Sequence, residues 1–181
     1  MDTTYTSHMN KSIITSLILA LACTIALSSA TRAQNKYVIT YEGFGPVKIG
    51  MTRTQAGKAL GVSVLRDAGY DDNSCYYSSP KTGFKDVSFM MSGSRIVRID
   101  INNKNYATDK GARIGDTEAR IKALYKGRFK VTKHHYVDNG HYIEVRMPGG
   151  RNKIIFETDG KRVTTFRVGR PEEVAYIEGC A

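Results

Sequence analysis

The stretch VSFMMSGSRIVRIDI at residues 87–101 decides the fold, because a second stretch, IIFETDGKRVTTFRV at residues 154–168, aligns with it without a gap. In both stretches apolar residues alternate with polar ones on either side of a glycine turn, which is the pattern of a β-hairpin. Three positions are identical, namely Phe89/Phe156, Gly93/Gly160 and Arg95/Arg162. Two hairpins of the same design in one chain predict an internal duplication.

A second match lies upstream of each hairpin, in VKIGMT at residues 47–52 and ARIGDT at residues 112–117. The two matches occur in the same order, so the duplicated unit is longer than the hairpin alone. In the first copy, Thr52 and Gln55 form a capping-box pattern, and Gly61 is a typical helix stop. A short helix is therefore predicted between Thr52 and Gly61.

The second copy carries comparable helix signals. Asp116 and Glu118 favour a helix N-terminus, and Gly127 is predicted to end the helix. Helices this short are marginal in isolation, so both must pack on another element. Further strands are predicted at residues 75–77, 129–131 and 142–146.

Together these elements predict an α+β protein made of two tandem repeats, at residues 34–108 and 109–181. Each repeat is a short helical segment packed on an antiparallel β-sheet. One face of the sheet meets the helix, and the other face is expected to stay open.

The N-terminal residues have the features of a secretory signal peptide. Lys11 precedes the apolar residues 13–27, and small residues follow up to Ala33. The alternatives are a transmembrane anchor, which needs about 20 apolar residues, and a lipid-modified Cys23. We predict a signal peptide at 1–33, a mature chain without a transmembrane span, and a periplasmic or secreted location.

Two cysteines, Cys75 and Cys180, remain after such a signal peptide is removed. In an oxidising compartment they most simply form one disulfide. It would close a loop of about a hundred residues and contribute roughly 4–5 kcal/mol in the chain-entropy model. The alternative is a catalytic thiol. The position of Cys180, one residue from the C-terminus, is more typical of a cysteine that tethers the end of the chain.

The positive charge of the chain limits the kinds of partner that it is expected to bind. The chain has 181 residues and a formal net charge of +10, with basic residues concentrated between Lys126 and Lys153. Nucleic acid is the usual partner of such charge inside a cell. Because the protein is predicted to be exported, we expect no nucleic acid partner. An acidic protein is the predicted partner, with an envelope polymer or anionic lipid as alternatives.

The pattern Ile49-Gly50-Met51-Thr52 with Gln55, a short helix, Gly61 and then antiparallel strands resembles the small envelope module of the outer-membrane assembly lipoprotein family. Two tandem copies, secreted and disulfide-bonded, are similar to the β-lactamase inhibitory protein family. The resemblance implies two helix-plus-sheet repeats side by side, with a concave sheet surface that grips another protein. No contact motif of these families has a match in this chain, which also lacks Trp.

Patterns of catalytic chemistry are weak. No Gly-x-Ser-x-Gly motif or phosphate-binding glycine loop is present in the sequence. A metal site built from His134 or His135 with Asp138 and His141 is one alternative, and an acid/base pair of His141 with Glu144 is another. Since neighbouring strand residues point to opposite faces, His134 and His135 cannot both join one site. We predict no enzyme activity, no cofactor and no metal.

Strand alternation supplies the candidate binding residues. If Phe89, Val97 and Ile99 face the helices, the opposite face carries a mixture of charged, Tyr and Met side chains, which is typical of an interface. The Gly-Tyr-Asp-Asp-Asn loop at residues 69–73 is a second candidate for recognition. The predicted partner-binding residues are Met90, Arg98, His134, Tyr136, Tyr142, Glu144, Arg146, Glu157 and Arg167.

These observations predict an exported, non-enzymatic protein-binding module that grips its partner through an open sheet face. An inhibitor is one such role. The alternative is an envelope structural or assembly factor that contacts the outer membrane or the cell wall.

Overall fold

A computed structural model describes the chain at residues 37–69, 74–147 and 149–180. The predicted signal peptide at 1–33 lies outside these residues, as does the predicted recognition loop apart from Gly69. Within the described ranges, no helix is both long enough and apolar enough to cross a membrane.

The first helix, α2 (Arg53–Leu60), confirms its predicted capping. The Thr52 side chain accepts a hydrogen bond from the Gln55 backbone N–H at 3.2 Å, and the Gln55 side chain accepts one from the Thr52 N–H at 2.9 Å. Gly61 ends the helix with φ of 73°, a left-handed conformation that a residue with a Cβ rarely adopts. Ala56 and Leu60 are the buried residues of this helix.

The second helix, α3 (Glu118–Leu124), begins after Thr117, whose side chain accepts a hydrogen bond from the Arg120 N–H. It ends at the cap residue Tyr125, earlier than the predicted stop at Gly127. Tyr125 is buried, and its hydroxyl donates to the Thr108 side chain at 2.8 Å. Tyr125 leaves the helical conformation with φ of −115°, and Gly127, with φ of 74°, lies in the turn that follows the helix.

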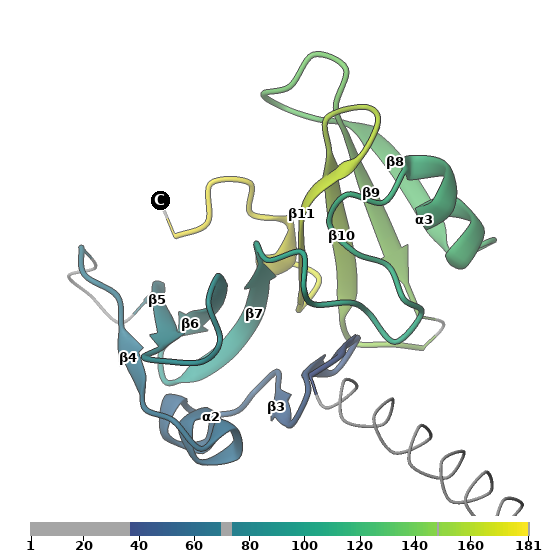
Figure 1. The fold of residues 1–181 in the computed structure, drawn as a ribbon. Coiled ribbons are helices and arrows are strands. Elements are labelled where there is room, and N and C mark those ends of the chain that lie inside the picture. Colours follow the sequence, from purple (N-terminus) through teal and green to yellow (C-terminus); the bar gives the residue numbers. More distant parts are fainter. Residues whose placement is uncertain (1–36, 70–73, 148, 181) are drawn as a thin grey trace, which may run out of the picture. The chain divides into compact units, whose positions relative to one another are not determined.

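Two antiparallel sheets complete the fold (Figure 1). A small sheet joins three two-residue strands: β1 (Ile39–Thr40), β2 (Gly43–Phe44) and β3 (Val47–Lys48). The large sheet has eight strands in the order β4-β5-β6-β7-β11-β10-β9-β8. Their bounds are β4 (Val64–Arg66), β5 (Tyr76–Pro80), β6 (Val87–Ser92), β7 (Arg95–Ile101), β8 (Phe129–Lys133), β9 (His141–Arg146), β10 (Lys153–Thr158) and β11 (Val163–Gly169).

The α+β class and the predicted strands are therefore confirmed. Residues 87–101 and 154–168 each form an antiparallel hairpin, β6–β7 and β10–β11, and the two hairpins meet where β7 pairs with β11. The small sheet and β4 were not predicted. Strands of two or three residues are too short to show an alternating pattern.

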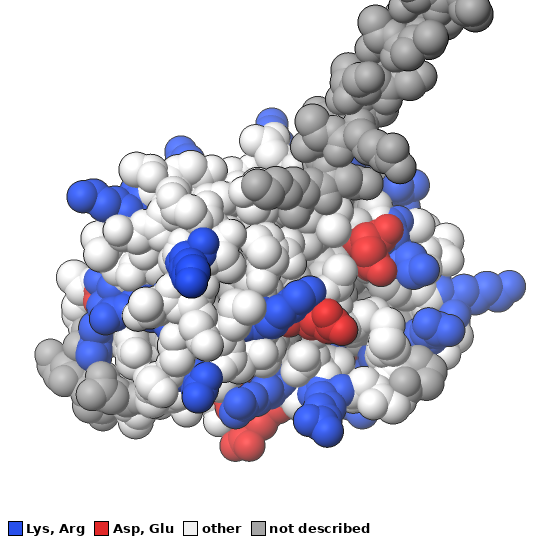
Figure 2. All heavy atoms as spheres, turned by 90° about the horizontal axis from the view of Figure 1, so that it is seen from below, with Lys and Arg blue, Asp and Glu red and all other residues white. Residues whose placement is uncertain are grey.

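Basic residues lie on the surface, as the composition implies. Figure 2 shows Lys and Arg side chains spread over the face seen from below, with few acidic side chains among them. They stand apart from one another on this face and do not merge into one patch.

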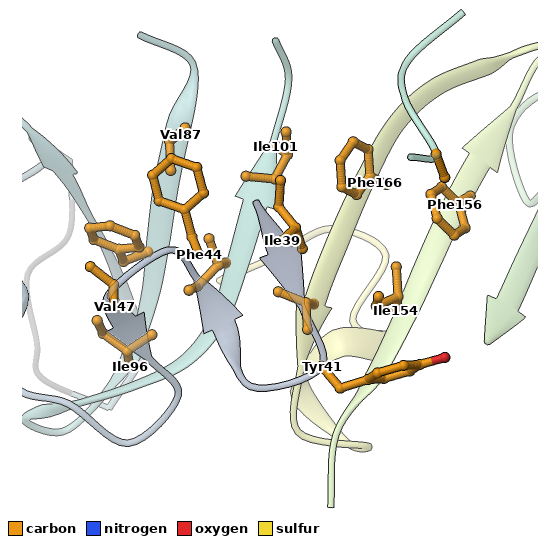
Figure 3. Close-up of a cluster of buried hydrophobic side chains, with 14 of the residues drawn as sticks. Ile39, Tyr41, Phe44, Val47, Val87, Ile96, Ile101, Ile154, Phe156 and Phe166 are labelled. Atoms are coloured by element: carbon orange, nitrogen blue, oxygen red, sulfur yellow. The ribbon is translucent and has the colours of Figure 1, made fainter. Parts of the chain in front are cut away.

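One hydrophobic core lies between the helices, the small sheet and one face of the large sheet. Ile39 and Phe44 from the small sheet pack with Ile101 and Phe166 from the large sheet, and all four side chains are fully buried (Figure 3). Because this core contains residues from both hairpins and both helices, the described residues belong to one compact unit, Tyr37–Ala181.

The predicted orientation of Val97 is wrong, because β6 and β7 shift register between Met90 and Met91. Met90 lies opposite Arg98, whereas Met91 lies opposite Ile96, which leaves Val97 as the extra residue of a β-bulge. Ile96 therefore joins the core in place of Val97. Alternation alone cannot reveal a bulge, since the residue types on both sides are compatible with either register.

Candidate functional site

The predicted binding residues do share one region of the molecule. Cross-strand pairing places the strand members on the face of the large sheet opposite the core, here called the outer face. His134 and Tyr136 follow β8 and lie beside it, since His134 stacks on Tyr142 with ring centroids 4.4 Å apart. The residues that the structure brings together here are Met90, Arg98, His134, Tyr136, Tyr142, Glu144, Arg146, Glu157 and Arg167.

The outer face is not open, which corrects the prediction. The C-terminal segment, defined as residues 170–180, crosses it and forms a short 3-10 helix, η2 (Glu173–Ala175). Val174 of η2 is fully buried and packs with Tyr142 and Ile155. Met90 is 0% exposed, Arg167 4% and Arg98 5%. These three residues, with Tyr142 and His134, are buried and do not present a free surface.

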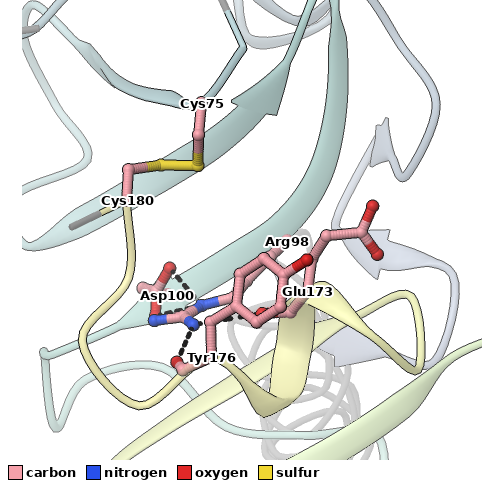
Figure 4. The surroundings of a disulfide bond; sticks show 6 residues. All are labelled: Cys75, Arg98, Asp100, Glu173, Tyr176 and Cys180. Carbon is pink, nitrogen blue, oxygen red and sulfur yellow. Dashed lines mark hydrogen bonds and ion pairs between the residues drawn. A yellow bond between two sulfur atoms is a disulfide. The ribbon is translucent and has the colours of Figure 1, made fainter.

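Arg98 holds the C-terminal segment by its backbone (Figure 4). Its Nη1 donates to the carbonyl oxygens of Tyr176 at 2.6 Å and Glu173 at 3.2 Å. Its Nη2 lies 2.7 Å from Oδ1 of Asp100, and its Nε donates to the same carboxylate. The guanidinium is thus occupied by its own chain and neutralised by a neighbouring carboxylate.

Arg167 does the same from β11. Its Nε donates to the Val174 carbonyl oxygen at 2.6 Å, and its Nη1 forms an ion pair with Glu157. Glu157 also lies 3.4 Å from Nε2 of His134. The charged residues at the centre of the outer face therefore form a buried network, which fixes the C-terminal segment.

A disulfide holds the end of this segment. Cys75 and Cys180 are bonded, with their Cα atoms 5.4 Å apart, and Figure 4 shows the bond beside the Arg98 network. The predicted pairing is confirmed. The C-terminal segment is consequently clamped by two arginines and one covalent bond.

Arg146 and Tyr136 remain exposed among the predicted residues. The side chain of Arg146 is 64% exposed, and Tyr136 is 61% exposed while its hydroxyl donates to Glu178. Glu144 is half-buried between Arg146 and Lys153, with Lys153 Nζ 3.0 Å from its Oε2. Burial raises the pKa of Glu144, but hydrogen bonds from Arg146 and Lys153 outweigh it and lower the pKa below its ordinary value. Glu144 is thus an ionised, paired group and is poorly suited to donate a proton.

A basic pocket adjoins Arg146, and the residue-level prediction missed most of its lining. The pocket has a volume of about 610 Å³ and combines three cations with exposed apolar side chains. The signal that could have found it is the density of Lys and Arg between residues 126 and 133, because Phe129 lies among them. This basic pocket is defined by Gly127, Arg128, Phe129, Lys130, Glu144, Arg146 and Met147.

The histidines do not assemble as the alternatives required. His141 Nδ1 lies 2.7 Å from Oε1 of Glu118 on α3, so it does not pair with Glu144. His134 contacts Glu157 and Tyr142 on the outer face. In the part of the chain that the structure describes, no three His, Cys, Asp or Glu side chains are grouped to hold a metal ion.

Glu118 is the centre of a second buried polar cluster. Its Oε1 accepts from the Thr158 hydroxyl at 2.6 Å, and its Oε2 lies 3.0 Å from Lys122 Nζ. Burial by itself raises the pKa of Glu118, but hydrogen bonds from Thr158, His141 and Lys122 outweigh it and hold the pKa below 4.5, its ordinary value. The cluster fixes α3 to the ends of β9 and β10.

This lowered pKa predicts a pH-dependent contribution to stability. A carboxylate whose pKa is lower in the folded than in the unfolded chain stabilises the fold above its ordinary pKa, and the contribution is lost as pH falls through the folded value. As the pH falls from about 6 to about 3, we expect the free energy of unfolding to decrease less in Glu118→Gln than in the native chain. Urea titrations at each pH measure this difference. Part of the loss remains, because the pKa values of Glu144 and Asp159 are also lowered.

Glu42→Gln is the matched control, since the Glu42 side chain is 76% exposed in its pair with Lys48. This variant should follow the native chain across the same pH range. An acid-induced loss in Glu118→Gln as large as that of the native chain would contradict the role given to the cluster.

Comparison with known proteins identifies no family and no function. No family model matches the sequence, and no curated protein matches it. The structure is similar to that of the uncharacterized protein yfeY from Escherichia coli, with a TM-score of 0.49 and 14% identity, over 74% of this chain and 99% of that chain. It is also similar to a DUF4309 family protein (YjgB) from Bacillus subtilis subsp. subtilis str. 168, with a TM-score of 0.45 and 12% identity, over 77% of this chain and 91% of that chain.

Proposed function

We propose that the chain contains two equivalent repeats, residues 34–108 and 109–181, which supply the strands β4–β7 and β8–β11 of the large sheet. Both hairpins carry a register shift at the same place, between Met90 and Met91 in the first and between Glu157 and Thr158 in the second. These positions coincide when residues 87–101 are aligned with residues 154–168. A shared irregularity supports common design more strongly than shared alternation does, because bulges are specific features of a sheet.

A matched pair of side-chain contacts supports the same proposal. Arg95 Nη1 donates to the Gly50 carbonyl oxygen at 3.1 Å, and Arg162 Nη1 donates to the Gly115 carbonyl oxygen at 2.7 Å. Both glycines have φ of 92°. In each repeat the arginine of the hairpin therefore holds the turn that precedes the helix.

We propose that this chain is an exported, non-enzymatic protein-binding module, and inhibition is one form that such binding can take. Export is supported by the predicted signal peptide and by the disulfide, since disulfides persist in oxidising compartments. A non-enzymatic role is supported by the pairing of Glu118, His141, His134 and Glu157 with structural partners.

The basic pocket is the observation that carries the proposal. Arg, aromatic and Met side chains are enriched at protein interfaces, and the pocket presents Arg128, Phe129 and Met147 on rigid strands or beside them. Phe129 is 37% exposed and Met147 42% exposed. The three cations of the pocket outnumber its one carboxylate, Glu144, and this excess of positive charge favours encounter with an acidic partner.

Neutralising the pocket should weaken binding. We expect the triple variant Arg128→Gln, Lys130→Gln, Arg146→Gln to bind a protein partner, captured from periplasmic or extracellular extract and then purified, at least about tenfold more weakly. The matched control removes the same charge elsewhere, at three exposed lysines: Lys81→Gln, Lys104→Gln, Lys110→Gln. Titration calorimetry at two salt concentrations measures both variants, and native affinity in the pocket variant contradicts the site.

An envelope role is the second candidate function, and the spread of Lys and Arg over the face in Figure 2 favours it. Attraction to anionic lipid or to a cell-wall polymer depends on total charge more than on one pocket. Equal weakening in both triple variants, with salt-sensitive pelleting on vesicles of anionic lipid, would select this role over protein binding.

A further inference from the structure

Strand β8 leaves one side of its backbone unpaired by the sheet. It lies at the end of the strand order, with β9 as its neighbour on the other side. Arg128 accepts from the Arg146 N–H at 3.0 Å, and the His134 N–H donates to Gly140 at 2.8 Å, so the even-numbered residues bond toward β9. In an antiparallel pair the intervening residues point their backbone groups the other way. The outward N–H and C=O groups therefore belong to Phe129, Val131 and Lys133.

The side chains of residues 126–133 along this edge are mostly exposed, and four of them are basic. All residues of β8 are exposed except Val131, which is half-buried. Among the described residues, no ion pair is formed by Lys126, Arg128, Lys130 or Lys133. Lys130 faces Glu144 across the strands, but that carboxylate is already paired with Arg146 and Lys153.

We propose that β8 binds an extended acidic peptide segment of a partner protein, which adds to the large sheet as a ninth strand. Main-chain hydrogen bonds to the outward groups of Phe129, Val131 and Lys133 supply the pairing, and pockets for alternate side chains supply the selection. Acidic side chains of the peptide meet Lys130 and Arg128. An apolar side chain enters the basic pocket against Phe129 and Met147. This inference rests on the proposed protein-binding function and names its mode and partner.

Charge complementarity excludes the main competing occupant. A second copy of this chain pairing edge to edge would bring the four unpaired cations that lie in or just before one β8 against those of the other. Like charges facing each other across paired strands are destabilising, and lysines on an edge strand commonly prevent such self-pairing. An acidic strand would face these cations without repulsion, so the β8 edge favours an acidic peptide over a second copy of the chain.

The test uses the disulfide-bonded chain and a synthetic peptide of about ten residues in which Glu alternates with Val. We expect salt-sensitive binding, and amide hydrogen exchange at least about tenfold slower at Phe129, Val131 and Lys133 in the complex. The same peptide with Lys in place of Glu should not bind. A peptide with N-methyl groups at alternate residues should also fail to bind, because it keeps its charge and loses its pairing groups.

One variant removes an outward donor without breaking the sheet. Val131→Pro deletes an N–H that β9 does not use, and Pro is tolerated on edge strands in that position. We expect it to weaken peptide binding roughly threefold to tenfold, whereas Val131→Ala, which keeps the N–H, binds as the native chain does. The N-methyl peptide tests the same bonds from the other side, should Val131→Pro fold poorly.

The outcomes separate this inference from the function on which it rests. Equal binding of the acidic peptide and its N-methyl form, or no protection of the three amides, overturns strand addition while the pocket still binds a partner. Dimers of the free chain in sedimentation would also overturn it by assigning the edge to a second copy. If the pocket triple variant loses partner binding but the native chain does not bind the acidic peptide, the protein-binding function stands and strand addition is overturned.

Discussion

Replacing both Cys75 and Cys180 by Ser lowers the free energy of unfolding by about 4–5 kcal/mol. The disulfide joins residues that are 105 positions apart, so it removes much of the freedom of the unfolded chain. Domains of this size are stable by only about 5–15 kcal/mol. Loss of the bond should therefore shift the urea midpoint strongly and leave the variant close to its unfolding threshold.

Reductant supplies the matched control for the disulfide. The native chain treated with dithiothreitol should unfold at the midpoint of the double Ser variant, and reductant should not change that variant further. The segment it tethers should also loosen, with faster amide exchange at Val174, whose N–H bonds to Arg170. A change in stability below about 1 kcal/mol would mean that the Arg98 and Arg167 contacts hold the segment by themselves.

Local signals predicted most of the large sheet. The two hairpins follow from alternation around Gly93 and Gly160, and the first helix follows from Thr52, Gln55 and Gly61, because each signal lies within a few residues of the element it specifies. The disulfide was predictable for another reason, since Cys75 and Cys180 are the two cysteines that lie outside the predicted signal peptide.

The burial of the outer face could not be predicted in this way. It depends on residues 170–180 crossing strands from both hairpins, and a contact across such a separation leaves no local pattern. Arg98 and Arg167 were correctly placed on that face, but an arginine on an alternating strand has the same pattern whether it meets water or a carbonyl oxygen. Sequence thus predicted the position of these residues, and the structure supplied their surroundings.

Arg98→Met should cost about 3–5 kcal/mol of the free energy of unfolding. The change leaves Asp100, whose side chain is 13% exposed, without its counter-ion. It also removes the donor from the carbonyl oxygens of Glu173 and Tyr176. A buried charge left alone is costly because water is not available to replace its partner. Urea unfolding at neutral pH measures the loss.

The double variant Arg98→Met, Asp100→Leu distinguishes the cost of an unpaired Asp100 charge from the contribution of the ion pair itself. Removing both members of a buried ion pair is often nearly neutral, so we expect the double variant to recover most of the loss. Lys48→Met, which breaks the exposed pair with Glu42, is the surface control and should cost no more than about 1 kcal/mol. If Arg98 instead contacts a partner, Arg98→Met will weaken binding and leave stability unchanged. If it clamps residues 170–180, stability falls while the folded fraction binds acidic peptide at β8 with native affinity.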